Sequence, residues 1–286
     1  MFPSIDTKSV TAVAEAVRAI MAATFPGVSL QVADRLFADV EAMFTGRHLD
    51  YQAVDLGYHD FEHSLQATLC FARLFAGRHA AHAEPVLSVR HFELGLAAAL
   101  LHDTGYLKLR SDRAGTCAKY TRVHVLRSCA FAASYLPEVG FTLRDTEIVT
   151  GAIRCTGPIS RLARLYFNAR ADQLLGCMLV TADYLGQMAA TDYPDELELL
   201  FGEFLESDEF FHLPTEHFTF QSDRELIEKT PDFWMKFVRP KLEKEFEGVY
   251  RFLALPYPDG PNPYVDAIER NIALVRTRIA AGTLSG

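Results

Sequence analysis

The 286-residue sequence has no hydrophobic run long enough to cross a lipid bilayer. Its longest purely apolar stretch is Leu96–Leu101, whereas a membrane-spanning helix needs about 20 apolar residues. The first ten residues, MFPSIDTKSV, also lack the basic and apolar regions of a signal peptide. We therefore expect a soluble, cytoplasmic protein that does not associate with a membrane.

Cysteine is scarce, and its arrangement excludes two common uses of this residue. The chain has five cysteines, an odd number, and no C-x-x-C pair, which argues against a disulfide framework and against a cysteine-based zinc site. We expect reduced thiols at all five positions, which are Cys70, Cys117, Cys129, Cys155 and Cys177.

The chain has no large excess of positive charge. The net charge is −9; residues 192–247, with 16 acidic and 6 basic side chains, carry −10, and the rest of the chain carries +1. Because nucleic-acid polymers are bound through basic surfaces, the sequence argues against a DNA or RNA partner. A small anion, such as a phosphorylated metabolite, remains compatible with the nearly neutral remainder of the chain.

The alternating pattern of β-strands is also missing, and apolar residues recur at helical spacing instead. The sequence contains no internal repeat and no linker long enough to separate two domains, so we predict a single all-α domain over residues 1–286. Beyond a first helix near Val10–Met21, helices are predicted over residues 30–44, 62–77, 90–103, 120–136, 143–154, 171–188, 195–206, 223–248 and 263–281.

The segment YHDFEH places two histidines, His59 and His63, four residues apart, with acids at Asp60 and Glu62. On a helix, residues four apart share a face, so the two imidazoles are expected to point toward one small volume. Three explanations fit this spacing: a metal ion, a phosphate group or an ordinary helix surface.

Two apolar helical runs end in polar residues that favour the metal. AAALLHDTGYLKL places the pair His102–Asp103 after a core-like run, and Asp183 follows a second run in GCMLVTADYLGQM. Burying a carboxylate is unfavourable unless a cation or strong donors compensate it. An ordinary ion pair at a helix end is the alternative for His102–Asp103. Asp172 or Asp192 is an alternative to Asp183.

The order H…HD…D resembles the signature of the HD-domain superfamily of metal-dependent phosphohydrolases. YHDFEH is similar, more narrowly, to the Y-H-N-x-x-H segment of class I cyclic-nucleotide phosphodiesterases. In that segment the second histidine is a metal ligand and the first protonates the leaving oxygen. The resemblance extends from about Tyr58 to Gln187 and implies a helical bundle of the HD-domain or phosphodiesterase type.

The resemblance implies a role in the active site for each of these residues. His63, His102, Asp103 and Asp183 would bind a divalent ion, with Asp103 in the catalytic centre. Mixed nitrogen and oxygen ligands suit Mn, Fe, Mg or Co, and Zn also fits. The ion would activate a water molecule as the nucleophile, and His59 would be the general acid.

Two departures from the phosphodiesterase pattern concern a second metal ion. Tyr106 stands where that family has a further histidine after the HD pair, and near Ile153 the chain offers Cys155 and Thr156 instead of another histidine. His124 lies where many two-metal HD proteins have an extra ligand. We therefore predict one firm metal site and a second, weaker one that shares Asp103.

Phosphate binding needs groups beyond the metal ion, and we predict Arg127 and Gln187 for this role. Arg127 is one turn from His124, and Gln187 is one turn from Asp183. The other basic residues near the motifs are Lys108, Arg110 and Arg154.

The predicted function is metal-dependent hydrolysis of a small phosphoester of the nucleotide or cyclic-nucleotide class. The alternatives are a di-iron oxygenase built on an HD fold and a regulatory HD module without catalysis. A zinc protease of the H-E-x-x-H type is set aside, because Asp60 stands where that motif needs glutamate. The sequence leaves open whether the chain forms a homodimer.

Overall fold

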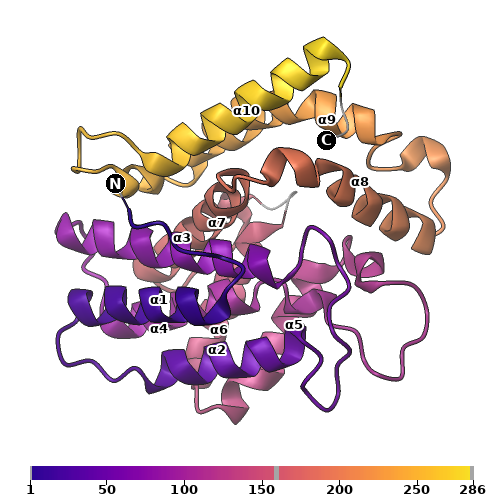
Figure 1. The fold of residues 1–286 in the computed structure, drawn as a ribbon. Helices are drawn as coiled ribbons and strands as arrows, with labels where there is room; N and C mark the ends of the chain where they lie inside the picture. Colours follow the sequence, from indigo (N-terminus) through magenta and orange to yellow (C-terminus); the bar gives the residue numbers. More distant parts are fainter. Residues whose placement is uncertain (1, 158–160, 284–286) are drawn as a thin grey trace.

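The computed structural model describes residues 2–157 and 161–283, and it confirms the all-α prediction (Figure 1). Between them the described ranges form no strand pairing beyond two isolated bridges, Thr45 with Ala53 and Tyr51 with Leu109. Within these ranges the chain forms ten α-helices: α1 (Val10–Thr24), α2 (Gln31–Phe44), α3 (Phe61–Ala80), α4 (Val89–Leu101), α5 (His124–Glu138), α6 (Leu143–Ile153), α7 (Arg170–Met188), α8 (Tyr193–Phe210), α9 (Asp223–Asp232) and α10 (Pro263–Ala281).

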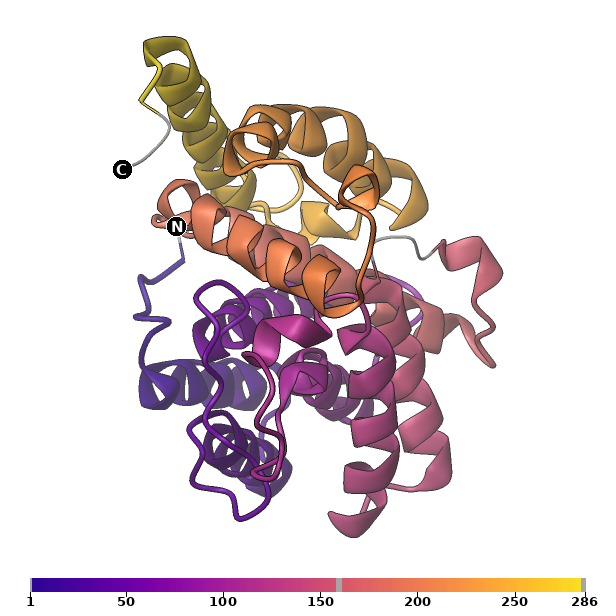
Figure 2. The ribbon, with the colours of Figure 1, turned by 90° about the vertical axis from the view of Figure 1, so that its right-hand side faces the viewer.

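Helices α3 and α7 lie at the centre, with α1, α2, α4 and α6 on one side and α8, α9 and α10 on the other (Figures 1 and 2). The two central helices approach closely at Gly186. A Cβ atom at this position would lie 2.9 Å from the backbone of Gln66 and Ala67, closer than a methyl group tolerates. Gly186 therefore permits the contact that brings the first turns of α3 next to the last turns of α7.

Side-chain caps fix the beginnings of several helices. Asp60 accepts a hydrogen bond from the backbone N–H of His63 at 3.1 Å and so begins α3. Ser88 and Thr142 form capping boxes that begin α4 and α6. Because Asp60 is the cap, His59 lies just before the helix rather than on it, which differs from the expectation of a shared helix face.

The predicted helix over residues 223–248 is helical as far as Glu245, but its geometry changes along its length. Helix α9 ends at Asp232 and is followed by two π-helical segments, Phe233–Val238 and Lys241–Glu245. Pro240, which lies between these segments, has no N–H to donate to the α-helical ladder, and wider turns of this kind accommodate such a loss. Helical periodicity alone did not reveal this change.

All ten helices contribute to one continuous hydrophobic cluster of buried residues. Its members include Phe71 of α3, Leu96 of α4, Met178 of α7 and Trp234 of the first π-helical segment. No described helix is both long and apolar enough to cross a membrane.

Candidate active site

Three helices bring the four predicted metal ligands together. His63 lies in the first turn of α3, His102 and Asp103 follow the last turn of α4, and Asp183 lies in α7. His63 Nε2 lies 3.2 Å from Asp183 Oδ1, 3.3 Å from Asp103 Oδ2 and 3.3 Å from His102 Nε2. His102 Nε2 lies 3.4 Å from the same Asp103 oxygen and 3.7 Å from Asp183 Oδ1. The structure thus gathers two imidazoles and two carboxylates around one point.

The orientation of these groups fits a bound cation. His102 Nδ1 lies 2.8 Å from the carbonyl oxygen of Ala99 and donates its proton there, which leaves the Nε2 lone pair facing Asp103 and Asp183. Asp103 Oδ2 is buried and has no hydrogen-bond partner. A buried carboxylate oxygen without a donor is costly unless a positive charge lies against it, so the donor set fits a divalent ion.

The pKa shifts of these groups also indicate that the space between them favours a positive charge. Burial by itself would lower the pKa of His102, but the neighbouring carboxylates of Asp103 and Asp183 outweigh it and raise this pKa to about 9. Burial would raise the pKa of both acids, and the adjacent histidines hold each below its usual value. The two carboxylates therefore retain a cation in this space, whether a proton on imidazole or a metal ion.

Gln187 supports the Asp183 carboxylate. Its side-chain amide donates to Asp183 Oδ1 and to the Asp183 carbonyl oxygen, each at 3.1 Å, and its own oxygen accepts from the Tyr58 hydroxyl at 2.6 Å. The amide lines the cavity, and both its nitrogen and its oxygen have partners within the protein. The predicted contact of Gln187 with a substrate stays a prediction, and in this structure the side chain is bound to Asp183 and Tyr58.

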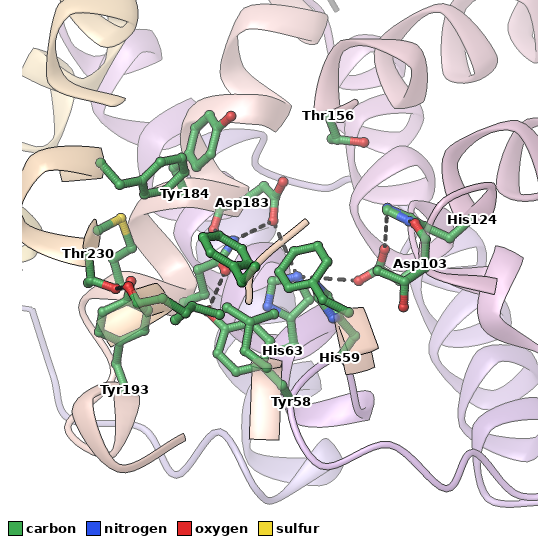
Figure 3. Close-up of a pocket in the computed structure, with 18 of the residues that line it drawn as sticks. Tyr58, His59, His63, Asp103, His124, Thr156, Asp183, Tyr184, Tyr193 and Thr230 are labelled. Atoms are coloured by element: carbon green, nitrogen blue, oxygen red, sulfur yellow. Dashed lines mark hydrogen bonds and ion pairs between the residues drawn. The ribbon is translucent and has the colours of Figure 1, made fainter. Parts of the chain in front are cut away.

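His124 is brought to the other oxygen of Asp103. Its Nδ1 lies 2.7 Å from the Thr121 carbonyl oxygen, and its Nε2 lies 3.7 Å from Asp103 Oδ1. Gly105 makes this approach possible, because a Cβ there would lie 1.9 Å from the carbonyl oxygen of His124. Asp103 therefore lies between His124 on one side and His63 on the other (Figure 3).

Tyr106 occupies the space between His59 and His124. Its ring stacks on His59 at 5.1 Å and on His124 at 4.8 Å between centroids. Cys155 and Thr156, which stand near Ile153 in place of a further histidine, are equally unsuited to bind an ion. Thr156 donates its hydroxyl to the carbonyl of its own turn, and burial raises the pKa of the Cys155 thiol well above its usual value. The described residues thus offer a second ion two protein ligands, Asp103 and His124.

His59 is held by Glu203 of α8, a residue that the sequence motifs did not indicate. One Glu203 oxygen lies 2.6 Å from His59 Nδ1, and the other accepts the backbone N–H groups of Tyr58 at 2.8 Å and His59 at 3.1 Å. Burial lowers the pKa of His59, but the charge and hydrogen bond of Glu203 more than offset this, so the net shift is upward. The imidazole of His59 also contacts that of His63, with centroids 5.3 Å apart.

Arg127 does not join the site. Its guanidinium donates to the carbonyl oxygens of Gly105 at 2.6 Å and Leu107 at 2.8 Å and lies over the Tyr120 ring. The prediction that it contacts the substrate is therefore not supported, because these contacts commit it to holding the loop after Asp103. Lys108 and Arg110 likewise donate to backbone carbonyls, and Arg154 is exposed and does not line the cavity.

The alternatives to Asp183 lie elsewhere. Asp172 accepts from the backbone N–H of Ala169 at the beginning of α7 and pairs with Arg144. Asp192 pairs with Lys8 at 3.0 Å. Neither carboxylate belongs to the cluster around His63.

The cluster forms one end of a cavity of about 490 Å³. His59, Tyr106 and His124 line the same end, and Figure 3 places Tyr184, Tyr193 and Thr230 on the opposite side from Asp103 and His124. Helices α8 and α9 and the start of the π-helical segment supply much of the remaining wall. The volume suits a small molecule whose reactive group meets the histidines and acids.

The sequence matches no protein-family model and no curated protein sequence. Among solved structures, the chain is similar to the phosphodiesterase domain of the Salpingoeca rosetta rhodopsin phosphodiesterase, with a TM-score of 0.61. The similarity covers 96% of this chain and 89% of that one, at 15% sequence identity. The chain therefore has the all-helical fold of a phosphodiesterase domain over nearly its whole length.

Proposed function

We propose that this protein is an HD-type phosphohydrolase that hydrolyses a phosphoester at a divalent metal ion held by His63, His102, Asp103 and Asp183. The observation that carries the proposal is the convergence of two imidazoles and two carboxylates at the end of a cavity. An ion bound there supplies Lewis acidity toward the phosphoryl oxygens and lowers the pKa of a water molecule to produce the nucleophile. The phosphodiesterase-like fold supports the same reaction class.

The proton for the leaving oxygen comes from His59. Its Nδ1 is bound to Glu203, so its Nε2 is the nitrogen that serves the substrate. The negative charge of Glu203 keeps the imidazolium form available, as general-acid catalysis requires. His59 is also fixed by stacking on Tyr106, which limits its freedom to turn away.

We assign one firm metal ion and a weaker second ion shared through Asp103. Mn, Fe, Mg, Co and Zn all suit the firm site's donors. The limited ligand set of the second ion, Asp103 and His124, speaks against a di-iron oxygenase, which needs two tightly held irons. The retention of all four ligands of the firm site speaks against a regulatory module.

The decisive experiment compares two leaving groups in the wild-type protein and in the His59→Asn variant. With Mn²⁺ bound, an alkyl phosphodiester should lose about 10²- to 10⁴-fold in kcat in the variant, the usual size of general-acid catalysis. A p-nitrophenyl ester should lose far less, because its phenolate leaves without a proton. Metal content should be unchanged. Equal losses on both esters, or loss of the metal, would reject the role of His59.

Metal analysis of protein purified without chelator separates the rival functions. One tightly bound divalent ion with phosphoesterase activity supports the proposal. Two irons per chain with a mixed-valence signal would favour the oxygenase, and a protein that takes up no metal would favour the regulatory module.

A further inference from the structure

The cavity wall away from the metal ligands is apolar. Six side chains from α7, α8, α9 and the segments next to α9 form most of it: Met188, Leu200, Phe204, Phe220, Leu226 and Phe233. Aromatic rings of this wall pack on one another: the ring centroids of Phe204 and Phe220 are 5.4 Å apart, and those of Tyr184 and Phe233 are 6.1 Å apart. A molecule that reaches from the metal ligands into the rest of the cavity therefore meets mainly hydrocarbon and aromatic surface.

The neutral polar side chains in the cavity are largely engaged within the protein. Gln187 is the one side-chain amide among the described lining residues, and it is bound to Asp183 and Tyr58. Three threonines line the cavity, and each donates its hydroxyl to a carbonyl of its own turn: Thr121 to Ala118, Thr156 to Ile153 and Thr230 to Leu226. Three neutral hydroxyls remain without a hydrogen-bond partner among those described above. That of Tyr106 is buried near His59 and His124, and those of Tyr184 and Tyr193 lie on the wall opposite Asp103 (Figure 3).

The charged residues of this wall are paired with each other. Lys229 lies 2.5 Å from Glu225, and Lys236 lies 2.7 Å from Asp232, in each case one helical turn away. Lys229, Asp232 and Lys236 are exposed, so they mark the solvent edge of the cavity rather than its interior, and Glu225 does not line the cavity. They leave the interior of the wall without a charged group of its own.

We propose that the natural substrate of this site is a phosphoester whose organic group is a hydrocarbon, rather than a nucleoside. The proposal rests on the proposed function, because it assumes that the phosphoryl group lies at the metal ligands. A nucleobase carries several donors and acceptors that must be paired when buried, and this wall offers too few partners. An alkyl or aryl group gains free energy from the same wall in proportion to the apolar area it buries.

Binding of alkylphosphonates tests the proposal without turnover, because the carbon–phosphorus bond is not hydrolysed. Methyl-, butyl- and octylphosphonate and adenosine monophosphate are titrated calorimetrically into the Mn²⁺-loaded protein. The Kd should fall roughly threefold for each added methylene until the wall is covered. Octylphosphonate should bind at least tenfold more tightly than the nucleotide, and removing Mn²⁺ with a chelator should weaken its binding.

A pair of neighbouring residues on α8 provides the matched variant and control. Leu200 lines the cavity, whereas Leu199 is 48% exposed and does not. Leu200→Asn should reduce the octyl-to-methyl ratio of affinities about tenfold, and Leu199→Asn should leave it unchanged. A Kd that does not depend on chain length, or tighter binding of the nucleotide than of octylphosphonate, would overturn the proposal.

Hydrolysis separates this proposal from the proposed function. Octyl p-nitrophenyl phosphate should be cleaved with a higher kcat/KM than methyl p-nitrophenyl phosphate. If the phosphonate series behaves as expected but neither ester is cleaved with any divalent ion, the hydrolase function fails and the hydrocarbon preference stands. If nucleotides are cleaved and the phosphonate series is flat, the hydrolase function stands and the hydrocarbon preference fails.

Discussion

The two ends of the cavity are built differently. At the metal end, His63, His102, Asp103 and Asp183 are each at most 8% exposed and come from helices that pack closely around α3 and α7. At the opposite end, Phe233 is 40% exposed and stands at the beginning of a π-helical segment. The proposed metal ligands thus lie on buried elements, while the wall proposed to contact the organic group lies nearer to solvent.

The charged side chains at the two ends of the cavity also differ in their burial and in their partners. The two buried carboxylates of the proposed metal site both face imidazoles, and one oxygen of Asp103 has no hydrogen-bond donor. The lysines of the opposite end are paired with acids one turn away on exposed helix surface, an arrangement that adds little stability because solvent screens it. Substitutions at the two ends should therefore differ greatly in effect.

The largest effect is expected for Asp103→Ala at the metal end. Asp103 is the carboxylate that faces His63, His102 and His124, so its removal should abolish metal binding and reduce kcat/KM by about 10³-fold or more. Metal content and hydrolysis of an aryl phosphodiester are the measurements. Asp145→Ala, which removes another buried acid that pairs with Arg90, is the control and should keep the metal. Full metal stoichiometry in Asp103→Ala would contradict the ligand assignment.

A smaller but still large effect is expected for Glu203→Gln. The substitution removes the charge beside His59, so the pKa of His59 should fall. A general acid acts while it is protonated, and activity declines as pH rises through its pKa. The variant's decline should therefore begin at lower pH, with about a 10-fold loss at pH 8 for an alkyl ester.

The control for this experiment is Glu206→Gln on the same helix. Glu206 binds Thr116 and does not line the cavity, so this variant should keep the wild-type pH profile. An unchanged profile in Glu203→Gln would show that His59 does not depend on that carboxylate.

Gln187→Leu is expected to weaken metal binding without abolishing it. The variant loses the donor that orients Asp183, and the loss of such a partner typically costs about 10- to 100-fold in metal affinity. Competition with a chromogenic chelator measures the Kd. Gln173→Leu makes the same change on the same helix, α7, away from the cavity and should bind metal like the wild type. Equal affinities in both variants would leave Gln187 without a positioning role.

The smallest effect is expected where α8 passes the beginning of α3. Burial, followed by the charges of Asp192, Asp60 and Glu62, raises the pKa of Glu196 to about 7. The folded protein thus favours the protonated form and loses stability as pH rises from the ordinary glutamate range toward 7. Glu196→Gln should remove this loss, a gain of about 1 kcal/mol at pH 8 after allowance for solvent screening.

Urea denaturation at pH 5 and pH 8 measures this difference. The exposed Glu198→Gln on the same helix is the control and should retain the pH dependence of the wild type. If Glu196→Gln kept the same dependence, the raised pKa of Glu196 would not be its source.

Much of the fold could be predicted from the sequence because helical periodicity is a local property. The predicted ranges 143–154 and 263–281 agree closely with α6 and α10. The predicted helix over 223–248 is helical as far as Glu245, but most of the part after Asp232 has wider π-helical turns, which depend on Pro240 and on how the segment packs. The single-domain organisation and the cytoplasmic location stay predictions.

The candidate site could be predicted only where its residues lie in short motifs. His63, His102 and Asp103 stand in recognisable segments, and the structure brings them together with Asp183. Arg127 was chosen because it shares a helix face with His124, yet its guanidinium turns to backbone carbonyls. Sequence spacing gives the face of a helix but not the partner that a long, flexible side chain will find.

The sequence by itself determined the helices, the apolar faces and the polar residues that interrupt them, because these follow from local periodicity and from the cost of burying charge. Only the tertiary structure decided which distant groups meet. Glu203 lies 144 residues from His59 in the chain, and no local pattern links them. The tertiary structure also decided that Gln187 is bound to Asp183 and Tyr58 and that α8 and α9 line the cavity with apolar side chains. These contacts depend on how the helices pack around α3 and α7, which local sequence patterns do not specify.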